Sequence, residues 1–165
     1  MEIERKYLLS PEQAHMLEKY SSQEIEQSYI SAYPVIRLRK IIGGAYGDGE
    51  YVLTAKGSGA IIREEFEIAI DGEQYDRLLS KIEGNVIKKT RYIIPLPDGH
   101  TAEADVYQGY LSGLMTVEVE FADEDDMNSF APPEWFGRDV SEEREYKNVA
   151  LAMWGHSFVF RPLTD

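Results

Sequence analysis

Charged residues two positions apart recur in one extended-looking segment of the chain after another. The series begins with Glu2, Glu4 and Lys6 and runs to Glu118 and Glu120. Residues two apart in a β-strand point to the same face, so each segment would send its charges one way and mostly apolar neighbours the other. The intervening members are Arg37 and Arg39, Thr54 and Lys56, Arg63, Glu65 and Glu67, Lys89 and Arg91, and Glu103 and Asp105. One such segment is typical of a half-exposed strand, but the whole series indicates a charged interior.

An interior that carries both signs of charge suits a metal-bound polyanion. Guanidinium groups form paired hydrogen bonds with phosphate oxygens, and lysines add point charge. Carboxylates would repel a phosphate chain directly, so their useful role is to hold divalent cations that bridge the protein and the phosphates. Oxygen ligands favour hard cations such as Mg²⁺ or Mn²⁺. The pattern therefore predicts a triphosphate-containing small molecule, bound with metal, as the substrate.

Turn signals join these segments into antiparallel neighbours. Asp48-Gly49, Gly57-Ser58-Gly59 and Asp98-Gly99 each lie between two of them. With residues 24–31 included, about eight strands are expected, which is enough to close a barrel. The glycine-rich stretch over residues 43–49 is predicted to be a hairpin loop, because it lacks the lysine and the strand-to-helix setting of a phosphate-binding loop.

Helices are expected over about 11–20, 72–83, 123–130 and 142–154, where apolar residues recur at helical spacing or capping residues precede them. Their apolar sides would cover the outer wall of the barrel. The predicted fold is therefore α+β: a closed antiparallel β-barrel of about eight strands, with a charged interior and helices packed on the outside. The length of 165 residues and the hydrophobic fraction of 43% fit a single domain over residues 1–165.

Composition excludes several classes of function. The net charge of −13 argues against binding of duplex nucleic acid, which requires a basic surface. An anionic ligand remains compatible, because the charge of a site and that of the whole chain can differ in sign. The absence of cysteine excludes thiolate metal sites and disulfides, and the spacing of His15, His100 and His156 predicts no zinc site.

The sequence also bears on location and assembly. No apolar run approaches the length of a bilayer span, and no basic-then-apolar leader is seen. We therefore expect a cytoplasmic protein that does not associate with a membrane. Phe158-Val159-Phe160 could cover one end of the barrel or pair with a second subunit, so a homodimer stays open.

The charged series resembles that of a known family. Glu2-Ile3-Glu4-Arg5-Lys6 is similar to the ExExK signature of the CYTH superfamily, also called triphosphate tunnel metalloenzymes. The resemblance continues in order through Gln27-Ser28-Tyr29-Ile30, Arg37-Leu38-Arg39, Leu53-Thr54-Ala55-Lys56-Gly57, Arg63-Glu64-Glu65-Phe66-Glu67, Lys89-Thr90-Arg91-Tyr92, Glu103-Ala104-Asp105, Gly113-Leu114, Val117-Glu118-Val119-Glu120 and Tyr146-Lys147-Asn148-Val149-Ala150-Leu151-Ala152. Ser28 and Ala102 depart from the glycine and the aromatic residue that are common in the family, which blurs the choice of substrate more than the fold.

The resemblance, which is to bacterial inorganic tripolyphosphatase-like members, implies a single CYTH domain that acts on triphosphates with Mg²⁺ or Mn²⁺. The implied metal ligands are Glu2, Glu4, Glu118 and Glu120. The implied substrate-binding residues are Lys6, Arg37, Arg39, Lys56, Arg63, Lys89 and Arg91. The implied catalytic residues are Lys6, Tyr29, Glu65 and Asp105. Lys6 would contact the phosphates or the leaving oxygen and Tyr29 would orient a phosphate or water, while the proton acceptor stays open among Glu65, Glu67, Glu118 and Asp105.

Hydrolysis of inorganic tripolyphosphate to pyrophosphate and phosphate is the favoured reaction, given the compact length and the Gln27-Ser28-Tyr29 string. A CYTH-type adenylate cyclase, which converts ATP to cyclic AMP and pyrophosphate, is the alternative from another reaction class. Hydrolysis of a nucleoside or thiamine triphosphate would require an aromatic clamp, for which Trp135, Tyr110 and Phe136 are available. A noncatalytic polyphosphate-binding module would be expected to lose a metal carboxylate, whereas both acidic pairs are intact.

Overall fold

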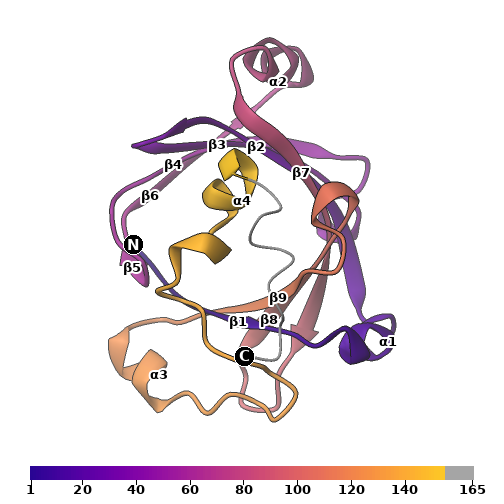
Figure 1. The fold of residues 1–165 in the computed structure, drawn as a ribbon, viewed down its shortest axis with the longest axis vertical. Coiled ribbons are helices and arrows are strands. Elements are labelled where there is room, and N and C mark those ends of the chain that lie inside the picture. Colours follow the sequence, from indigo (N-terminus) through magenta and orange to yellow (C-terminus); the bar gives the residue numbers. More distant parts are fainter. Residues whose placement is uncertain (155–165) are drawn as a thin grey trace.

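The computed structural model describes residues 1–154 and shows one antiparallel sheet that curves into a barrel (Figure 1). Its strands are β1 (Glu2–Leu8), β2 (Ser21–Ala32), β3 (Val35–Ile42), β4 (Glu50–Lys56), β5 (Ile62–Arg63), β6 (Glu65–Ile70), β7 (Glu83–Pro95), β8 (Thr101–Tyr107) and β9 (Met115–Glu120). Around the sheet they follow the order β5-β1-β9-β8-β7-β2-β3-β4-β6. The predicted antiparallel barrel is confirmed. Residues 155–165 of the predicted domain, with Phe158-Val159-Phe160, lie outside the described residues.

The barrel is nearly closed by two short strands that follow one another in the chain. β5 pairs with β1 at one end of the sheet, and β6 pairs with β4 at the other end. Only Glu64 separates them, and its carbonyl oxygen accepts a hydrogen bond from the backbone N–H of Gly57 at 2.9 Å. The strand that we predicted over this stretch is thus split in two, so the sheet has 9 strands instead of eight.

The outer wall of the barrel is apolar where helices cover it. Leu17 of α1 (Ala14–Leu17) and Met127 of α3 (Glu124–Ser129) pack with Phe136 against the outer faces of β1, β8 and β9. The wall residues of this cluster include Ile3, Tyr7, Ala104, Val117 and Val119. Burial of each large apolar side chain stabilises the fold by roughly 1.5–3 kcal/mol. The cover is partial, because Phe66 and Ile68 on β6 remain 61% and 48% exposed.

Helix α2 (Gly72–Leu79) lies at the edge of the barrel (Figure 1). The side chain of Asp71 accepts from the backbone N–H of Gln74, and the Gln74 side chain accepts from that of Asp71, which satisfies two donors at the helix start. Tyr75 packs on Tyr51 with 4.9 Å between ring centroids. The helix ends earlier than predicted because β7 begins at Glu83, where it pairs with β2.

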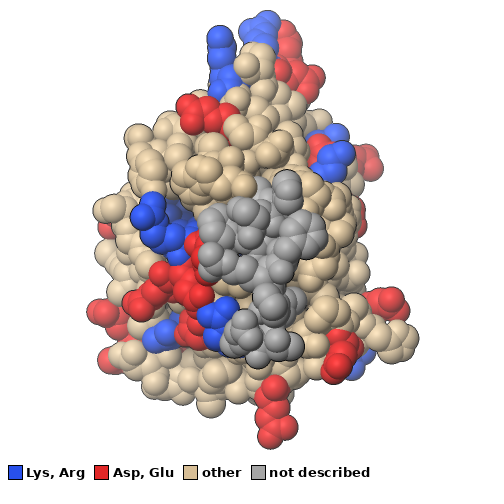
Figure 2. Space-filling model, in the orientation of Figure 1, with Lys and Arg blue, Asp and Glu red and all other residues tan. Residues whose placement is uncertain are grey.

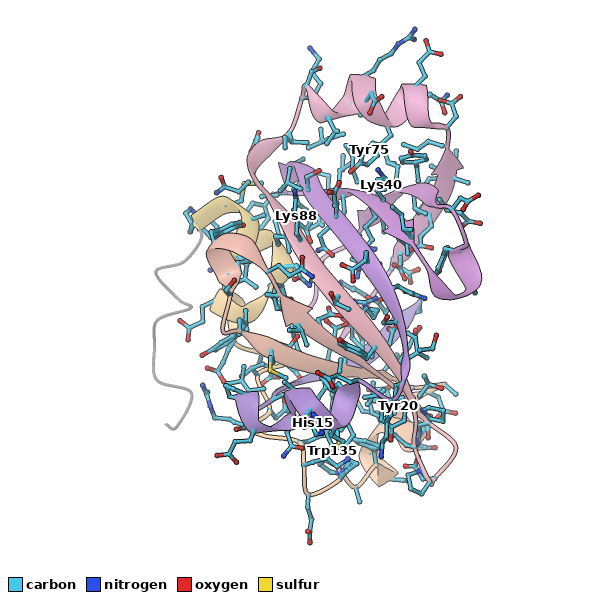
Figure 3. All side chains as sticks on the ribbon, turned by 90° about the vertical axis from the view of Figure 1, so that its right-hand side faces the viewer. His15, Tyr20, Lys40, Tyr75, Lys88 and Trp135 are labelled. Atoms are coloured by element: carbon cyan, nitrogen blue, oxygen red, sulfur yellow. The ribbon has the colours of Figure 1, made fainter. Side chains whose placement is uncertain are left out.

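Helix α4 (Asn148–Trp154) closes one end of the barrel and does not cover its outer wall, contrary to our expectation. Figure 1 shows α4 within the ring of strands, and the side view in Figure 3 places it at one end of the barrel. Leu151 and Ala152 are buried against Ile87 and Tyr107, which form an apolar end of the lumen. The short helix η4 (Arg144–Tyr146) precedes α4, so the predicted continuous helix over 142–154 is interrupted.

Glycine at position 84 allows α4 to lie this close to β7. Gly84 has φ of +72°, and a Cβ atom added there would lie 2.4 Å from the carbonyl oxygen of Ala152. Any larger residue would therefore be strained and would displace the helix. No helix within residues 1–154 is both long and apolar enough to span a bilayer.

A histidine between two carboxylates ties the β7–β8 turn to α3. His100 Nδ1 lies 2.8 Å from Asp98 Oδ2, and His100 Nε2 lies 2.8 Å from Asp126 Oδ1. The ring packs edge-on against Phe121 and Phe130. Hydrogen bonds that Asp98 and Asp126 accept raise the pKa of His100, whereas hydrogen bonds from His100 and nearby backbone N–H groups lower the pKa of both carboxyls.

We expect this contact to make stability depend on pH. A raised histidine pKa contributes stability that is present below its ordinary value of 6.5 and is lost as the pH rises through the folded-state value. The variant His100→Gln should therefore lower the melting temperature more at pH about 5.5 than at pH about 9, with a difference of roughly 2–4 °C. His15→Gln is the matched control, because the His15 side chain is 95% exposed. Equal losses at both pH values for His100→Gln would contradict the expectation.

Candidate active site in the barrel lumen

The lumen holds a cavity of about 320 Å³ that is lined mainly by charged side chains. Its carboxylates are Glu2, Glu4, Glu65, Glu67, Glu103, Glu118 and Glu120, and its cations are Lys6, Arg37, Arg39, Lys56, Arg63, Arg91 and Lys147. Figure 2 shows both signs side by side on the face that Figure 1 views. Seven groups of each sign balance one another in the lining, although the whole chain carries a net charge of −13. The site is therefore far less negative than the protein surface, as the binding of an anion requires.

Four of the lining carboxylates come from two neighbouring strands. β1 supplies Glu2 and Glu4, β9 supplies Glu118 and Glu120, and Glu4 lies directly opposite Glu120 in the register. Lys56 Nζ lies 2.8 Å from Glu2 Oε1, so lysine partly neutralises this group. Alternation along two paired strands thus gathers the predicted metal ligands on one wall of the cavity.

Charge within this acidic group is incompletely neutralised. In the described residues no ammonium or guanidinium nitrogen lies within 4.0 Å of the Glu4 carboxylate, and burial together with Glu118 and Glu2 raises the pKa of Glu4 to about 8. Burial and Glu2 also raise the pKa of Glu120. Burial opposes ionisation of Glu118 as well, but Lys6 and Arg91 outweigh it and lower the pKa of Glu118 to about 2. A cation would relieve the repulsion among these groups.

The donor set is of the kind that Mg²⁺ and Mn²⁺ prefer, since every candidate atom is a carboxylate oxygen. Within residues 1–154, no group of three or more Asp, Glu, His or Cys side chains is already arranged to hold a metal ion. Glu2 is drawn toward Lys56 and Glu118 toward Lys6, at 2.8 and 3.7 Å. These lysine contacts would compete with the binding of a cation by both glutamates.

The opposite part of the cavity carries arginines whose donors are not all used. Arg37 and Arg39 come from β3, and the Nε atoms of both are buried without a hydrogen-bond acceptor in the described residues. Burial, Arg37 and Arg91 lower the pKa of Arg39 to about 10. Buried donors without acceptors are costly unless a ligand supplies the oxygen atoms. This part of the lumen is therefore complementary to a polyanion.

Lys147 lines the cavity, although we interpreted it from the sequence as a helix-surface residue and did not include it in the predicted site. It lies between η4 and α4, and burial, Arg63 and Lys6 lower the pKa of Lys147 to about 8. The only sequence signal was its place in the Tyr146-Lys147-Asn148 string, because it lies outside the strands whose alternation shows the lumen-facing side. Lys6 reaches the same segment, since its Nζ donates to the carbonyl oxygen of Tyr146 at 2.7 Å.

Tyr29 and Glu65, two of the predicted catalytic residues, also line the cavity. The Tyr29 hydroxyl accepts from Gln27 Nε2 at 2.9 Å, and burial raises the pKa of Tyr29. Burial and Glu2 raise the pKa of Glu65, while Lys56, whose Nζ lies 4.0 Å away, lowers it. A carboxyl with a raised pKa inside a cavity is a candidate proton acceptor.

Two predicted site residues lie behind the lining. Lys89 and Asp105 are 0% and 1% exposed, and neither residue borders the cavity. Lys89 Nζ lies 2.7 Å from Asp105 Oδ2, and Asp105 in turn contacts Arg91. The three aromatic residues considered for a base or thiazole clamp are elsewhere as well. Trp135 and Phe136 belong to the apolar cluster outside the barrel, and Tyr110 packs against α4.

Two named proteins are similar in sequence to this chain. An inorganic triphosphatase of Nitrosomonas europaea is 50% identical over 104 residues, which cover 63% of this chain and 69% of the relative. An inorganic triphosphatase of Acetivibrio thermocellus is 33% identical over 152 residues, which cover 91% of this chain and 92% of the relative. No family model matches the chain.

A solved structure of a similar protein supports the same assignment. The crystal structure of the inorganic triphosphatase NE1496 superposes with a TM-score of 0.62 at 40% identity, and the match covers 93% of this chain and 95% of that one. Identity over most of both chains, the barrel topology and the charged lumen point to the same group of proteins. The chain therefore belongs to the CYTH superfamily of triphosphate tunnel enzymes, where its relatives are inorganic triphosphatases.

Proposed function

We propose that this protein hydrolyses inorganic tripolyphosphate to pyrophosphate and phosphate. The observation that carries the proposal is a single cavity with carboxylates on β1 and β9 and buried, incompletely hydrogen-bonded arginines on β3. The named relatives support the same reaction, since both are inorganic triphosphatases. Among the described residues, the only aromatic side chains in the lining are Tyr29, which is 2% exposed, and Tyr46. A substrate without an organic group is thus the best match.

In the proposed reaction the cations of the lumen bind and orient the phosphate chain. Arg37, Arg39 and Arg91 supply guanidinium donors, which pair with phosphate oxygens and stabilise charge that spreads over them in the transition state. Lys6, Lys56, Arg63 and Lys147 add positive charge on the neighbouring part of the cavity. Fixed donors in a buried site need no reorganisation when the bond to the leaving phosphate breaks, so they lower the barrier.

We assign the proton acceptor to Glu65. Of the four candidates, Asp105 lies behind the lining, Glu118 has a pKa of about 2, and the Glu67 side chain is 52% exposed. Glu65 borders the cavity and has a raised pKa. A base works best when its pKa approaches the working pH, which favours Glu65 for taking the proton of the attacking water.

We further propose that Glu2, Glu4, Glu118 and Glu120 hold Mg²⁺ or Mn²⁺. When bound, the metal would neutralise phosphate oxygens and activate water. The raised pKa of Glu4, which a bound cation would lower, and the all-oxygen donor set support this assignment. The homodimer and the cytoplasmic location stay predictions.

Hydrolysis of tripolyphosphate can be tested directly. Orthophosphate and pyrophosphate should be released in equal amounts when Mg²⁺ or Mn²⁺ is present, and the variant Glu4→Gln should lose about 10²-fold or more in rate, since it removes a metal ligand. Nucleotide products from ATP should be resolved by chromatography in the same experiment. Cyclic AMP with pyrophosphate would establish the cyclase instead, and tight binding without turnover in either metal would point to a noncatalytic module.

Removal of the Glu4 charge should stabilise the metal-free protein. Because its folded-state pKa of about 8 lies above the ordinary value of 4.5, ionisation of Glu4 costs stability as the pH rises between these values. In EDTA near neutral pH, Glu4→Gln should raise the free energy of unfolding by on the order of 1–3 kcal/mol. Addition of Mn²⁺ at about 100 times its dissociation constant should stabilise the wild type by about 2.7 kcal/mol and the variant little.

Denaturant unfolding with and without Mn²⁺ measures both effects. Glu134→Gln is the control, because Glu134 is exposed and does not line the cavity. An unchanged response of Glu4→Gln to Mn²⁺ would remove Glu4 from the metal site.

The buried arginines should act mainly through substrate binding. Arg39→Ala should raise KM for tripolyphosphate by about tenfold to hundredfold, since a hydrogen bond to a charged group contributes roughly 1.5–3 kcal/mol. The control is Lys40→Ala, because Lys40, labelled in Figure 3, is the next residue of β3 and faces away from the lumen. Initial rates over a range of substrate concentrations separate KM from kcat. Equal KM values for the two variants would exclude contact between Arg39 and the substrate.

A further inference from the structure

The residues behind Arg91 form a buried charged triad that the proposed reaction does not use directly. Arg91 Nε donates to Asp105 Oδ1 at 2.8 Å, and Arg91 Nη2 donates to Asp105 Oδ2 at 2.9 Å. This is the two-point contact in which the planar fork of arginine matches a carboxylate. Arg91 and Asp105 face one another across β7 and β8, where the register pairs them directly.

Lys89 completes the triad from the same strand as Arg91. Its Nζ lies 2.7 Å from Asp105 Oδ2 and 5.4 Å from the centre of the Tyr107 ring. The side chain is completely buried. Lys89 thus contacts the carboxylate oxygen that also accepts from Arg91 Nη2, so Asp105 is held by two cations.

Asp105 has little capacity left for other partners. Arg91 donates one hydrogen bond to each of its two carboxylate oxygens, and Lys89 Nζ adds an ion-pair contact at 2.7 Å. Neither Asp105 nor Lys89 borders the cavity, whereas Arg91 does. A metal ion, a water molecule or a phosphate in the lumen would therefore meet Arg91 first.

The triad leaves one positive charge directed at the lumen. Two cations surround one carboxylate, so the triad keeps one net positive charge, which Glu103 at the cavity offsets in part. Arg91 Nη1 remains on the side of the cavity, 3.4 Å from Glu103 Oε2. A guanidinium that is already immobilised loses less conformational entropy when it binds a phosphate than a free one would.

We infer that Asp105, supported by Lys89, is a positioning residue that orients the Arg91 guanidinium toward the bound phosphate chain. This inference rests on the proposed function, in which Arg91 contacts the substrate. It gives Asp105 and Lys89 a role that acts through Arg91, in place of the catalytic and substrate-binding roles expected from the family resemblance. Its consequence is that replacement of Asp105 matters only while the Arg91 guanidinium is present.

A double-mutant cycle in a binding assay tests this dependence. Dissociation constants for inorganic tripolyphosphate are measured by calorimetry in EDTA, so that no turnover is needed, for the wild type, Asp105→Asn, Arg91→Lys and the double variant. Loss of an oriented charged contact should weaken binding by about tenfold in each single variant. Because both changes disable the same contact, the double variant should bind within about twofold of Arg91→Lys. Tripolyphosphate affinity that Asp105→Asn leaves unchanged would overturn the inference.

Kinetics with metal present provide the second readout. Asp105→Asn should raise KM by about tenfold and change kcat by less than about threefold, because it disturbs binding in the ground state and the transition state alike. A fall in kcat of about 10² to 10⁴ at constant KM would instead assign Asp105 to the chemical step. If no variant and no wild type hydrolyses tripolyphosphate, the proposed function fails, while the binding cycle still decides the role of Asp105.

Two further variants distinguish a loss of tripolyphosphate binding from a loss of folding. Asp105→Asn leaves Lys89 buried without a carboxylate partner and leaves Arg91 with Glu103 alone, a loss that we expect to destabilise the fold by about 3–5 kcal/mol. The variant that combines Asp105→Asn with Lys89→Met keeps one net positive charge in the triad, and it should show the same loss of tripolyphosphate affinity. Lys88→Met is the matched control, because Lys88, labelled in Figure 3, is 60% exposed and pairs with Glu26 outside the barrel. Affinity restored to the wild-type value in the charge-matched variant would contradict the inference.

Discussion

Burial of many charges inside one barrel is the constraint on which the rest of the structure depends. A charged group that leaves water costs several kcal/mol unless a partner of opposite sign lies close to it. The lumen meets this demand with contacts between strands that are far apart in sequence, such as Lys56 with Glu2 and Lys6 with Glu118. Each partner must arrive at the correct register. Closure of the barrel therefore brings together the oppositely charged residues that neutralise the lumen.

The sequence could predict the face to which each charged side chain points, because alternation in a strand has a period of two residues. It could not predict how deep along the barrel axis each side chain lies. Lys89 and Arg91 share a face and differ by two positions, yet only Arg91 borders the cavity. Depth depends on strand tilt and on the far end of the barrel, neither of which is encoded locally. For the same reason the contact of Asp105 with both cations appeared only in three dimensions.

Other differences have equally local causes. The break between β5 and β6 follows from a hydrogen bond between Gly57 and Glu64, which a pattern of hydrophobicity does not contain. The position of α4 depends on the apolar end of the lumen at Ile87 and Tyr107, and amphipathic spacing alone cannot distinguish that surface from the outer wall. Lys147 directly precedes α4, so the position of this helix also places Lys147 in the lining. Thus these features depend on contacts between separate elements, which alternation within one strand does not reveal.

The position of α4 decides how molecules can pass through this barrel. Among residues 1–154, α4 packs on the apolar end of the lumen, so a phosphate chain would enter the cavity from elsewhere on the barrel. Substrate and products would then exchange through the same opening. The arrangement depends on Gly84, where a single methyl group would collide with the helix. The position of α4 at this end of the barrel thus depends on the lack of a side chain at Gly84.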